Sequence, residues 1–589
     1  MLIRLFKHIS RQRRYQFAGL VLLTVISSFA EVISLGAVVP FIGIITQPET
    51  VFKTPIVSRI AIYFGINSAH ELILPLTFSF IAAAVLAGAM RLLLLWIGIR
   101  LANATGADLS AEVYRRTLYQ PYRVHIDRSS SEIIAGITQK VATATSVLLS
   151  LVTVLTSIVL FIAIFVTLIL IDPLIATLAM LIFGASYGCI VYKTRQRLRR
   201  NSESIALQQT QVIKILQEGL GSIRDVLLDG SQLVYCNTYQ KSIQQLQYAT
   251  GENSYITIAP RYVMETLGLL LTGVFVCIIS GDEVEGVSGA LPVLGTLALG
   301  AQRLLPLLQL IYGNWTFVIG SQASLKDVLD LLEQPLPENA KQDQIKQLDF
   351  QRSIRFENVS FKYGVDLPLV LKQINFTISK GGRIGIVGST GSGKSTVLDL
   401  LMLLLKPTHG KILIDDCVIG DELCQAWQKN IAHVPQSIYL ADATLAENIA
   451  FGIPFDQIDF HRVKLAASQA QLSEFIENKP KSYYEFVGER GVRLSGGQRQ
   501  RIGIARALYK QANVLIFDEA TSALDNETEC DVMRAIEDLG NHLTICMVAH
   551  RLTTLEKCDQ IIEFRGGMVH HIGDYQSVVQ ASKAARTYQ

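Results

Sequence analysis

Charged residues are scarce in this sequence of 589 amino acids. Asp, Glu, Lys and Arg together make up 17% of it, and hydrophobic residues make up 50%, whereas soluble domains carry about 25% charged residues. This balance excludes an ordinary soluble protein and indicates a chain that lies partly in a lipid bilayer. The formal net charge of +3 is too small to indicate a nucleic-acid partner.

Cysteine is equally sparse, with eight residues and no Cys-x-x-Cys pair. Their spacing suits neither a zinc site nor a disulfide framework, so we expect free thiols. The length exceeds that of a single domain, since a domain takes about 100 to 200 residues. At least two domains are therefore expected.

Long apolar runs are present, and they fall within the first 318 residues. The first run, 17–45, follows a basic N-terminal arm and carries one charge, Glu31. It exceeds the roughly 7 to 15 apolar residues of a signal peptide and matches a spanning helix. Six runs are long enough to span, at 17–45, 72–99, 143–170, 174–192, 256–280 and 287–318. Asp172 and Pro173 leave room for only a tight turn, so the third and fourth spans form a hairpin.

The distribution of basic residues predicts the orientation of these spans. The N-terminal arm and the segments 100–140 and 193–200 are rich in Lys and Arg, whereas acidic residues gather at 282–285. Because basic segments stay on the cytoplasmic side, the N-terminus is predicted to be cytoplasmic. An even number of spans returns the rest of the chain to the cytoplasm. We expect a multi-pass protein of the inner (cell) membrane.

The composition changes around residues 334–347 to Pro, Glu, Asn, Lys and Gln, as in an exposed linker. Strand-like runs alternate with helical ones beyond it, which is an α/β pattern. We therefore predict a transmembrane domain over 1–330, a linker over 331–350 and an α/β domain over 351–589.

A phosphate-binding loop is predicted at Gly388–Ser395, because its glycines and lysine follow an apolar strand and precede a helix-forming run. Glycines let backbone N–H groups face a phosphate, and the helix N-terminus favours negative charge. Lys394 would reach the β- and γ-phosphates, and Ser395 would bind Mg²⁺. The nucleotide-binding residues predicted here are Gly388, Ser389, Thr390, Gly391, Ser392, Gly393, Lys394, Ser395 and Thr396. The alternative is a glycine-rich turn without a ligand.

A second apolar strand, 514–517, ends in Asp518 and Glu519. Ligands of α/β sheets bind at the carboxyl ends of the strands. Asp518 is predicted to bind Mg²⁺ and Glu519 to polarise the attacking water, since phosphoryl transfer needs positioning and charge neutralisation. An apolar run that ends in two carboxylates is common by itself, and the nearby phosphate loop favours the catalytic interpretation.

Between these strands stands Leu494-Ser-Gly-Gly-Gln498, and here the sequence resembles the ABC ATPase family over residues 353–580. The resemblance implies that Ser495, Gly496, Gly497 and Gln498 are the signature motif, which contacts the γ-phosphate bound on a partner subunit. It also implies an adenine-stacking role for Tyr363, a water- and magnesium-sensing role for Gln436, and a γ-phosphate contact for His550. The segments 488–491 and 522–525 resemble the X-loop and D-loop of the family.

Three expectations follow from this resemblance and from the apolar spans. The fold class is an all-α six-helix transmembrane domain plus an α/β P-loop ABC ATPase domain. The cofactors are ATP and Mg²⁺. Because each nucleotide would lie between one subunit's phosphate loop and the other's signature, the working unit is expected to be a homodimer.

The first 330 residues resemble, more loosely, the six-helix domain of ABC exporters. Segments 119–126 and 219–229 stand where that family carries coupling helices, although an ordinary solvated loop is the alternative. The runs 29–41 and 303–306 resemble bacterial lipid-linked-oligosaccharide flippases. The resemblance implies ATP-driven outward movement of an amphiphilic substrate. A peptide or drug exporter is an alternative, and an ATP-gated channel or channel regulator is a different class.

Three arginines, Arg91, Arg261 and Arg303, fall inside or near the ends of apolar spans. A charge at the centre of a span costs about 2.5 to 3.5 kcal/mol on insertion scales and needs a reason. Arg91 and Arg261 can snorkel towards headgroups, and Arg303 has Glu31 as its predicted counter-charge. The functional alternative is that all three bind an anionic headgroup, which a guanidinium fits well.

Overall fold

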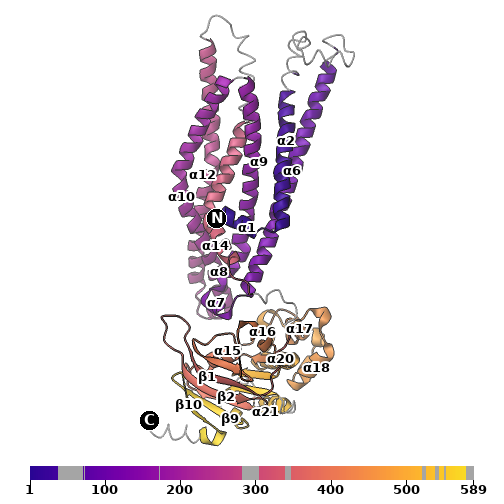
Figure 1. Ribbon diagram of the computed structural model, residues 1–589, viewed down its shortest axis with the longest axis vertical. Coiled ribbons are helices and arrows are strands. Elements are labelled where there is room, and N and C mark those ends of the chain that lie inside the picture. Colours follow the sequence, from indigo (N-terminus) through magenta and orange to yellow (C-terminus); the bar gives the residue numbers. More distant parts are fainter. Residues whose placement is uncertain are drawn as a thin grey trace. The chain divides into compact units, whose positions relative to one another are not determined.

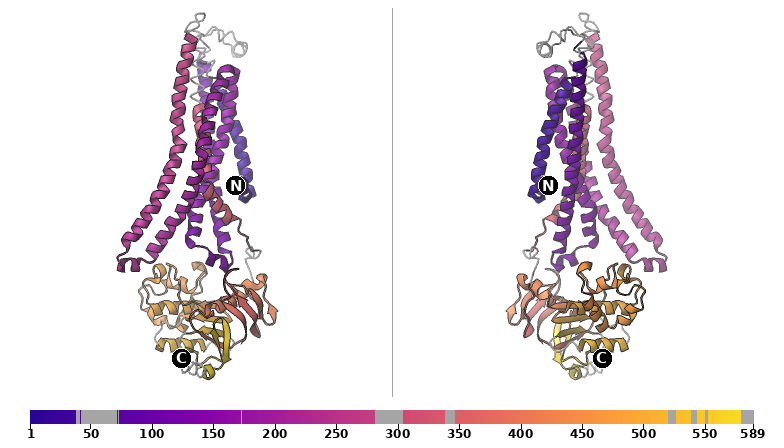
Figure 2. Two further views of the ribbon diagram at one scale, coloured as in Figure 1. Left: turned by 90° about the vertical axis from the view of Figure 1, so that its left-hand side faces the viewer. Right: turned by 90° about the vertical axis from the view of Figure 1, so that its right-hand side faces the viewer.

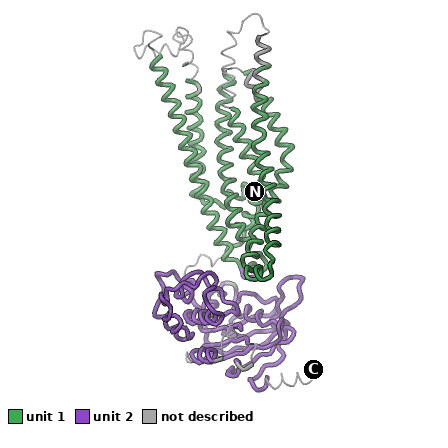
Figure 3. The backbone as a smooth tube through the Cα atoms, turned by 180° about the vertical axis from the view of Figure 1, so that it is seen from behind, with its two compact units in different colours: residues 1–120, 124–337 green, residues 121–123, 338–589 purple. Residues whose placement is uncertain are grey.

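The computed structural model describes residues 1–37, 41, 71, 73–171, 173–280, 304–337, 346–519, 526–537, 543–549 and 552–578. Its contacts divide the chain into two compact units, shown in Figure 3. Unit 1 comprises Met1–Gln120 and Val124–Pro337, and unit 2 comprises Pro121–Arg123 and Glu338–Gln589.

Unit 1 is built from helices, most of them long, and Figure 1 labels all but one of those named here. They are α1 (Leu2–His8), α2 (Arg11–Gly36), α6 (Ile73–Leu118), α9 (Val141–Ile171), α10 (Pro173–Gly221), α12 (Gln232–Ser280), the helix Leu304–Gly320 and α14 (Gln322–Leu332). Helices suit a bilayer because each one satisfies its backbone hydrogen bonds within its own segment. The predicted helical transmembrane domain is confirmed.

Three helical stretches among the described residues are long and apolar enough to cross a membrane. These are Arg11–Ser34, Ile73–Leu118 and Ser130–Leu170, and a fourth results if Leu304–Gly320 and Gln322–Leu332, which meet at 57°, count as one span. The predicted spans 174–192 and 256–280 lie within α10 and α12. Figure 2 shows these two helices side by side. The part of the sixth predicted span before residue 304 lies outside the described residues.

Short helices connect the long ones. The predicted hairpin is confirmed, since α9 ends at Ile171 and α10 begins at Pro173, where the fixed φ of proline suits a first helical turn. The segments resembling coupling helices overlap α7 (Tyr122–Asp127) and contain α11 (Ile223–Leu228). A helix α8 (Ser130–Ala135) and a π-helical turn (Gly136–Lys140) lead into α9.

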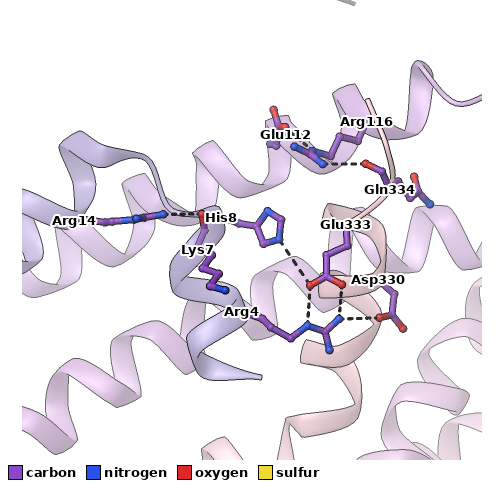
Figure 4. A network of polar contacts seen from close by, with 9 residues as sticks. All are labelled: Arg4, Lys7, His8, Arg14, Glu112, Arg116, Asp330, Glu333 and Gln334. Atoms are coloured by element: carbon purple, nitrogen blue, oxygen red, sulfur yellow. Dashed lines mark hydrogen bonds and ion pairs between the residues drawn. The ribbon is translucent and has the colours of Figure 1, made fainter. Parts of the chain in front are cut away.

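Ion pairs fasten the N-terminal helix α1 to the end of α14, as Figure 4 shows. Arg4 donates to both carboxylate oxygens of Glu333, at 2.7 and 2.5 Å, and lies 3.6 Å from Asp330. The hydrogen bond from Arg4 holds the pKa of the Glu333 carboxyl below its usual value. Arg116 on α6 donates to the carbonyl of Gln334 at 2.9 Å. Three segments distant in sequence thus meet at the end of α14.

Unit 2 contains two sheets. An antiparallel sheet has the order β2-β1-β4-β5, from β2 (Leu371–Ser379), β1 (Ser353–Phe361), β4 (His409–Ile414) and β5 (Cys417–Val418). The other has the order β10-β9-β3-β8-β7-β6, from β10 (Met568–Gly573), β9 (Gln560–Arg565), β3 (Arg383–Gly388), β8 (Thr544–Val548), β7 (Val514–Asp518) and β6 (Ile431–Val434). All pairs of the second sheet except β9 with β10 are parallel.

Helices cover these sheets and complete the predicted α/β domain. They are α15 (Lys394–Leu401), α16 (Asp421–Gln428), α17 (Leu445–Ile449), α18 (Phe460–Gln469), α19 (Ser473–Glu477), α20 (Gly496–Lys510) and α21 (Asn526–Glu537). The apolar face of α15, including Val397 and Leu401, shares one buried core with Ile354 of β1 and Ile386 of β3. This packing fixes the start of α15, and with it the loop that precedes the helix.

Gly106 on α6 generates a prediction about the packing of unit 1. A Cβ at Gly106 would lie 2.1 Å from Oγ1 and 2.7 Å from Cγ2 of Thr145 on α9. Since both branches of the threonine are in the way, rotation about χ1 cannot relieve the clash. Gly106→Ala should therefore destabilise the domain by about 1 to 3 kcal/mol, seen as a lower thermal unfolding midpoint in detergent.

The matched control for this prediction is Gly88→Ala, also on α6. A Cβ there meets nothing within 4 Å, so its effect should be neutral or slightly stabilising because alanine favours a helix. Equal midpoints for the two variants would contradict the predicted close approach of α6 and α9.

Candidate functional site

The predicted phosphate loop lies between β3 and α15, at the carboxyl end of β3. Gly393 caps α15 with φ of 98°, a left-handed conformation that favours glycine. A Cβ at Gly388 would lie 2.4 Å from the carbonyl oxygen of Phe564. Glycine at these two positions lets the loop pack closely against β9 and β2 and turn into the start of α15.

Lys394 folds back over this loop. Its Nζ donates to the carbonyls of Gly388 at 2.9 Å and Ser389 at 3.1 Å. Ser392 Oγ is buried and has no hydrogen-bond partner among the described residues. A phosphate oxygen would offer an acceptor to both side chains. The loop therefore fits a nucleotide phosphate.

Tyr363 follows strand β1 and lies next to the phosphate loop. Its hydroxyl is 3.1 Å from Oγ1 of Thr396 on α15, and its ring packs edge-on against Phe361, with the centroids 4.9 Å apart. These contacts place an aromatic ring beside the loop that is predicted to bind phosphates.

The predicted catalytic residues Glu519 and Gln436 come together. Gln436 Nε2 donates to Oε2 of Glu519 at 2.7 Å, although the two are 83 residues apart. They meet because β6, which precedes Gln436, and β7, which precedes Glu519, are adjacent and parallel. Glu519 has φ of 54°, a conformation that is rare in residues other than glycine and that gathers at functional sites.

Asp518 and Asp399 lie in an electrostatically unfavourable environment for carboxylates. Burial raises the pKa of Asp518, the neighbouring Glu519 raises it further, and Lys394 opposes both. Asp399 lies on α15, and burial together with Asp518 raises its pKa to about 6. The sequence analysis missed Asp399, because no motif marks it. Bound positive charge would stabilise the ionised form of both groups.

This environment fits a magnesium ion held largely by a nucleotide. Among the described residues no group of three or more His, Cys, Asp or Glu side chains could hold a metal. Mg²⁺ commonly takes one or two protein ligands and completes its shell with phosphate and water. The carboxylate of Asp518 and the exposed hydroxyl of Ser395 suit that pattern.

The predicted signature motif begins helix α20 with a capping box. Ser495 Oγ accepts from the backbone of Gln498 at 3.2 Å, and Gln498 Oε1 accepts from the backbone of Ser495 at 2.9 Å. No hydrogen bond or ion pair joins residues 495–498 to the phosphate loop within the described part of the chain. His550 and the predicted D-loop at 522–525 lie outside the described residues.

Arg506 on α20 is a second residue that the sequence analysis missed. Its guanidinium donates to the carbonyls of Asn448 at 2.9 Å and Tyr439 at 3.1 Å, and stacks on the ring of Phe451. Burial lowers its pKa to about 10. Arg506 thus ties the helix that begins at the signature to the segment that follows Gln436.

Unit 1 contains a cavity of about 400 Å³, here called the membrane pocket. It is lined by Thr24, Ser27, Ser28, Arg91, Leu94, Leu95, Gly98, Leu149, Val152, Thr153, Thr156, Ser157, Leu160, Ile164, Pro306, Leu307 and Leu310. Several of its hydroxyl groups donate to carbonyls of their own helices, such as Thr24 to Leu20. Their oxygens keep lone pairs with which to accept hydrogen bonds from a ligand.

The three arginines proposed for a headgroup site differ in their surroundings. Arg91 lines the membrane pocket, is 46% exposed, and pairs through Nη2 with Oε1 of Glu31. Arg261 does not line this pocket and donates to Glu265 on the same helix at 2.8 Å. Arg303 lies outside the described residues. The pair of Glu31 with Arg303 stays a prediction, and the contact of Glu31 with Arg91 is one that the sequence analysis did not give.

Two family models match the chain. The model described as "ABC transporter" matches residues 371–522, and the model described as "ABC transporter transmembrane region" matches residues 18–253. The first match contains the phosphate loop, and the second contains most of the long helices of unit 1. The chain belongs to the ABC transporter family.

Similar proteins agree with this assignment. An ATP-dependent lipid A-core flippase of Chromohalobacter salexigens is 32% identical over 473 residues, covering 79% of this chain and 80% of that protein. A flippase of the same description from Idiomarina loihiensis is 30% identical over 521 residues, covering 86% of each. A bacterial Atm1-family ABC exporter, solved with ATP bound, has the same fold at 24% identity, with a TM-score of 0.78 and 98% of both chains covered.

The site and the family together define the class of protein. The chain is an ABC exporter half-transporter, in which one membrane domain is joined to one nucleotide-binding domain. It binds and hydrolyses ATP as a transport ATPase. It is a membrane protein whose nucleotide-binding domain lies in the cytoplasm.

Proposed function

We propose that two copies of this chain form an ATP-driven flippase of the inner (cell) membrane that moves an amphiphilic lipid, such as a lipid-linked oligosaccharide, out of the cytoplasmic leaflet. The observation that carries this proposal is the membrane pocket. It combines leucine-rich walls, hydroxyl groups and one half-exposed arginine in a protein that hydrolyses ATP. An apolar tail and a polar, anionic headgroup both find complementary surroundings there.

The nucleotide site supports a division of roles among its residues. Lys394 and the backbone of residues 388–393 bind the phosphates, and Tyr363 stacks on adenine. Asp518, Ser395 and Gln436 hold Mg²⁺, which neutralises phosphate charge when bound. Glu519 orients and polarises the attacking water, and its hydrogen bond with Gln436 fixes its carboxylate. His550 contacts the γ-phosphate, as the family resemblance implies.

The signature motif supports the homodimer. Ser495 and Gln498 form the capping box at the start of α20. Among the described residues, no hydrogen bond or ion pair joins this helix start to the phosphate loop of the same chain. A second copy can present its own signature to that loop, and a two-fold axis makes both sites equivalent. ATP binding then closes the two nucleotide domains, and hydrolysis opens them.

The substrate assignment rests on chemistry shared with relatives. The relatives at 30% and 32% identity are described as lipid A-core flippases, whose substrate is an amphiphile. In this chain Arg91 offers donors that suit phosphate oxygens. Peptide and drug exporters are the competing class, and neutral drugs or peptides would make no use of Arg91.

Glu519→Gln should keep ATP binding and lower ATP hydrolysis by at least about 100-fold, the usual scale for losing a positioned general base. In proteoliposomes it should also abolish ATP-dependent transfer of a fluorescent anionic lipid between leaflets. Near-normal hydrolysis by purified Glu519→Gln would refute the catalytic role. Lipid transfer by the wild type that needs no ATP would refute the flippase.

The shared nucleotide sites should show complementation between defective subunits. Lys394→Ala removes a phosphate contact and Gly497→Asp places a carboxylate in the signature, so each homodimer should be inactive. A mixed dimer carries both defects in one site and leaves the other intact. We expect about half of the wild-type ATPase rate if the sites act independently, measured on dimers purified with two different affinity tags. Mixed dimers no more active than either parent would rule out shared sites.

A further inference from the structure

The helix α12 contains a proline in its interior. Pro260 is buried and has helical residues on both sides, from Gln232 to Ser280. Proline has no N–H, so it cannot donate the helical hydrogen bond to the carbonyl four residues earlier, which is that of Ile256. Ile256 is buried as well, and a buried carbonyl without a donor costs free energy. The sequence therefore creates a weak point in α12, here called the proline break, and one acceptor that needs another donor.

A neighbouring helix supplies this donor. The hydroxyl of Tyr312, on the helix Leu304–Gly320, donates to the carbonyl of Ile256 at 2.9 Å. The bond is buried, and Tyr312 is 5% exposed. In the low dielectric constant of a protein interior such a bond is stronger than in water. Tyr312 thus takes the place of the missing N–H and anchors the proline break to a second helix.

A second buried tyrosine offers a direct comparison. Tyr187 on α10 lies beside Tyr312, with the ring centroids 5.3 Å apart. Its hydroxyl is buried and has no hydrogen-bond partner among the described residues. Both rings belong to the same apolar cluster. Of these two tyrosines, Tyr312 is the one that bonds the carbonyl left open by Pro260.

Other contacts between the same two helices continue from this bond. Thr257 Oγ1 lies 3.1 Å from Oγ1 of Thr316. A Cβ at Gly320 would lie 2.9 Å from Nδ2 of Asn253. The residues 312, 316 and 320 therefore meet the residues 256, 257 and 253, so the two helices run antiparallel here. The bond of Tyr312 is the member of this row that lies at the proline break.

The proline break lies between two regions that transport must connect. The part of α12 before the break follows the segment 219–229, which resembles a coupling helix. The helix that carries Tyr312 borders the membrane pocket through Pro306, Leu307 and Leu310. A movement that enters α12 from the segment 219–229 reaches the pocket only if the break does not absorb it by bending. A proline in a helix interior makes such bending easy.

We propose that Tyr312 is a positioning residue for transport, whose hydroxyl replaces the backbone donor missing at Pro260 and holds the proline break in one geometry, so that ATP-driven movement of α12 reaches the membrane pocket. Tyr312 itself does not line the pocket. Without its hydroxyl the break bends more easily, so ATP hydrolysis continues while lipid transfer falls. This inference rests on the proposed lipid transport through the membrane pocket.

The test is Tyr312→Phe in proteoliposomes made from the full chain, with Tyr187→Phe as the matched control. Transfer of a fluorescent anionic lipid and ATP hydrolysis are measured together, which gives the number of lipids moved per ATP. Tyr312→Phe keeps the ring and removes one buried hydrogen bond, so we expect this number to fall at least about fivefold. The KM for ATP and the ATPase rate without lipid should stay unchanged. Tyr187→Phe removes a hydroxyl that has no described partner and should keep the wild-type number.

Pro260→Ala tests the link to the proline break, because alanine returns an N–H to the carbonyl of Ile256. In this background Tyr312→Phe should change the number of lipids per ATP less than about twofold. The same loss with and without Pro260 would overturn the inference. An unchanged number in Tyr312→Phe would overturn it too, and so would an equal loss in Tyr187→Phe, which would indicate disturbed packing of the cluster.

A measurement without lipid transfer separates this inference from the proposed function. If wild type transfers no lipid, the proposed function fails, and a solvent-sensitive fluorescent amino acid at Leu310 then decides about Tyr312. Leu310 borders the pocket and is 46% exposed. A non-hydrolysable ATP analogue should shift the emission in wild type and in Tyr187→Phe, and shift it less in Tyr312→Phe. Equal shifts, or no shift in any of the three, would reject the role of Tyr312.

Discussion

Parallel pairing of β3, β8, β7 and β6 is the constraint on which the nucleotide site depends. Parallel strands end at the same edge of a sheet, so the loops after them must lie together. The phosphate loop follows β3, Glu519 follows β7, and Gln436 lies two residues beyond β6. Buried strand residues and the packed face of α15 hold this edge in place. The chemistry of the site therefore depends on a core that contacts no nucleotide.

The membrane domain obeys a second constraint, the cost of charge in a bilayer. Of the three arginines proposed to bind substrate, Arg91 and Arg261 lie in the described part of the chain. Each of them pairs with a carboxylate. Their settings differ, because Arg91 borders a cavity and Arg261 pairs along its own helix. An ion pair beside a cavity can stabilise the helices and still offer donors to a ligand. Structural and functional interpretations of Arg91 are thus compatible.

Much of the nucleotide site was predictable, because its residues form short contiguous motifs with a known physical role. The glycines, Lys394 and Ser395 stand within eight residues, and the strands around them have clear patterns. The contact of Glu31 with Arg91 was not predictable in the same way. It depends on how α2 and α6 are rotated about their axes, which the packing of several helices decides together. Arg506 and Asp399 were missed because their roles arise from contacts between distant segments.

The central claim is that ATP hydrolysis moves an anionic amphiphile through the membrane pocket. The most direct measurement uses Gly98→Trp, which would fill the pocket from α6 without changing a charge or a nucleotide-site residue. Lipid transfer and ATPase activity are then measured in the same proteoliposomes. The account predicts that Gly98→Trp loses ATP-dependent lipid transfer and keeps ATP hydrolysis in the absence of lipid. Transfer at the wild-type rate with the pocket filled would contradict it.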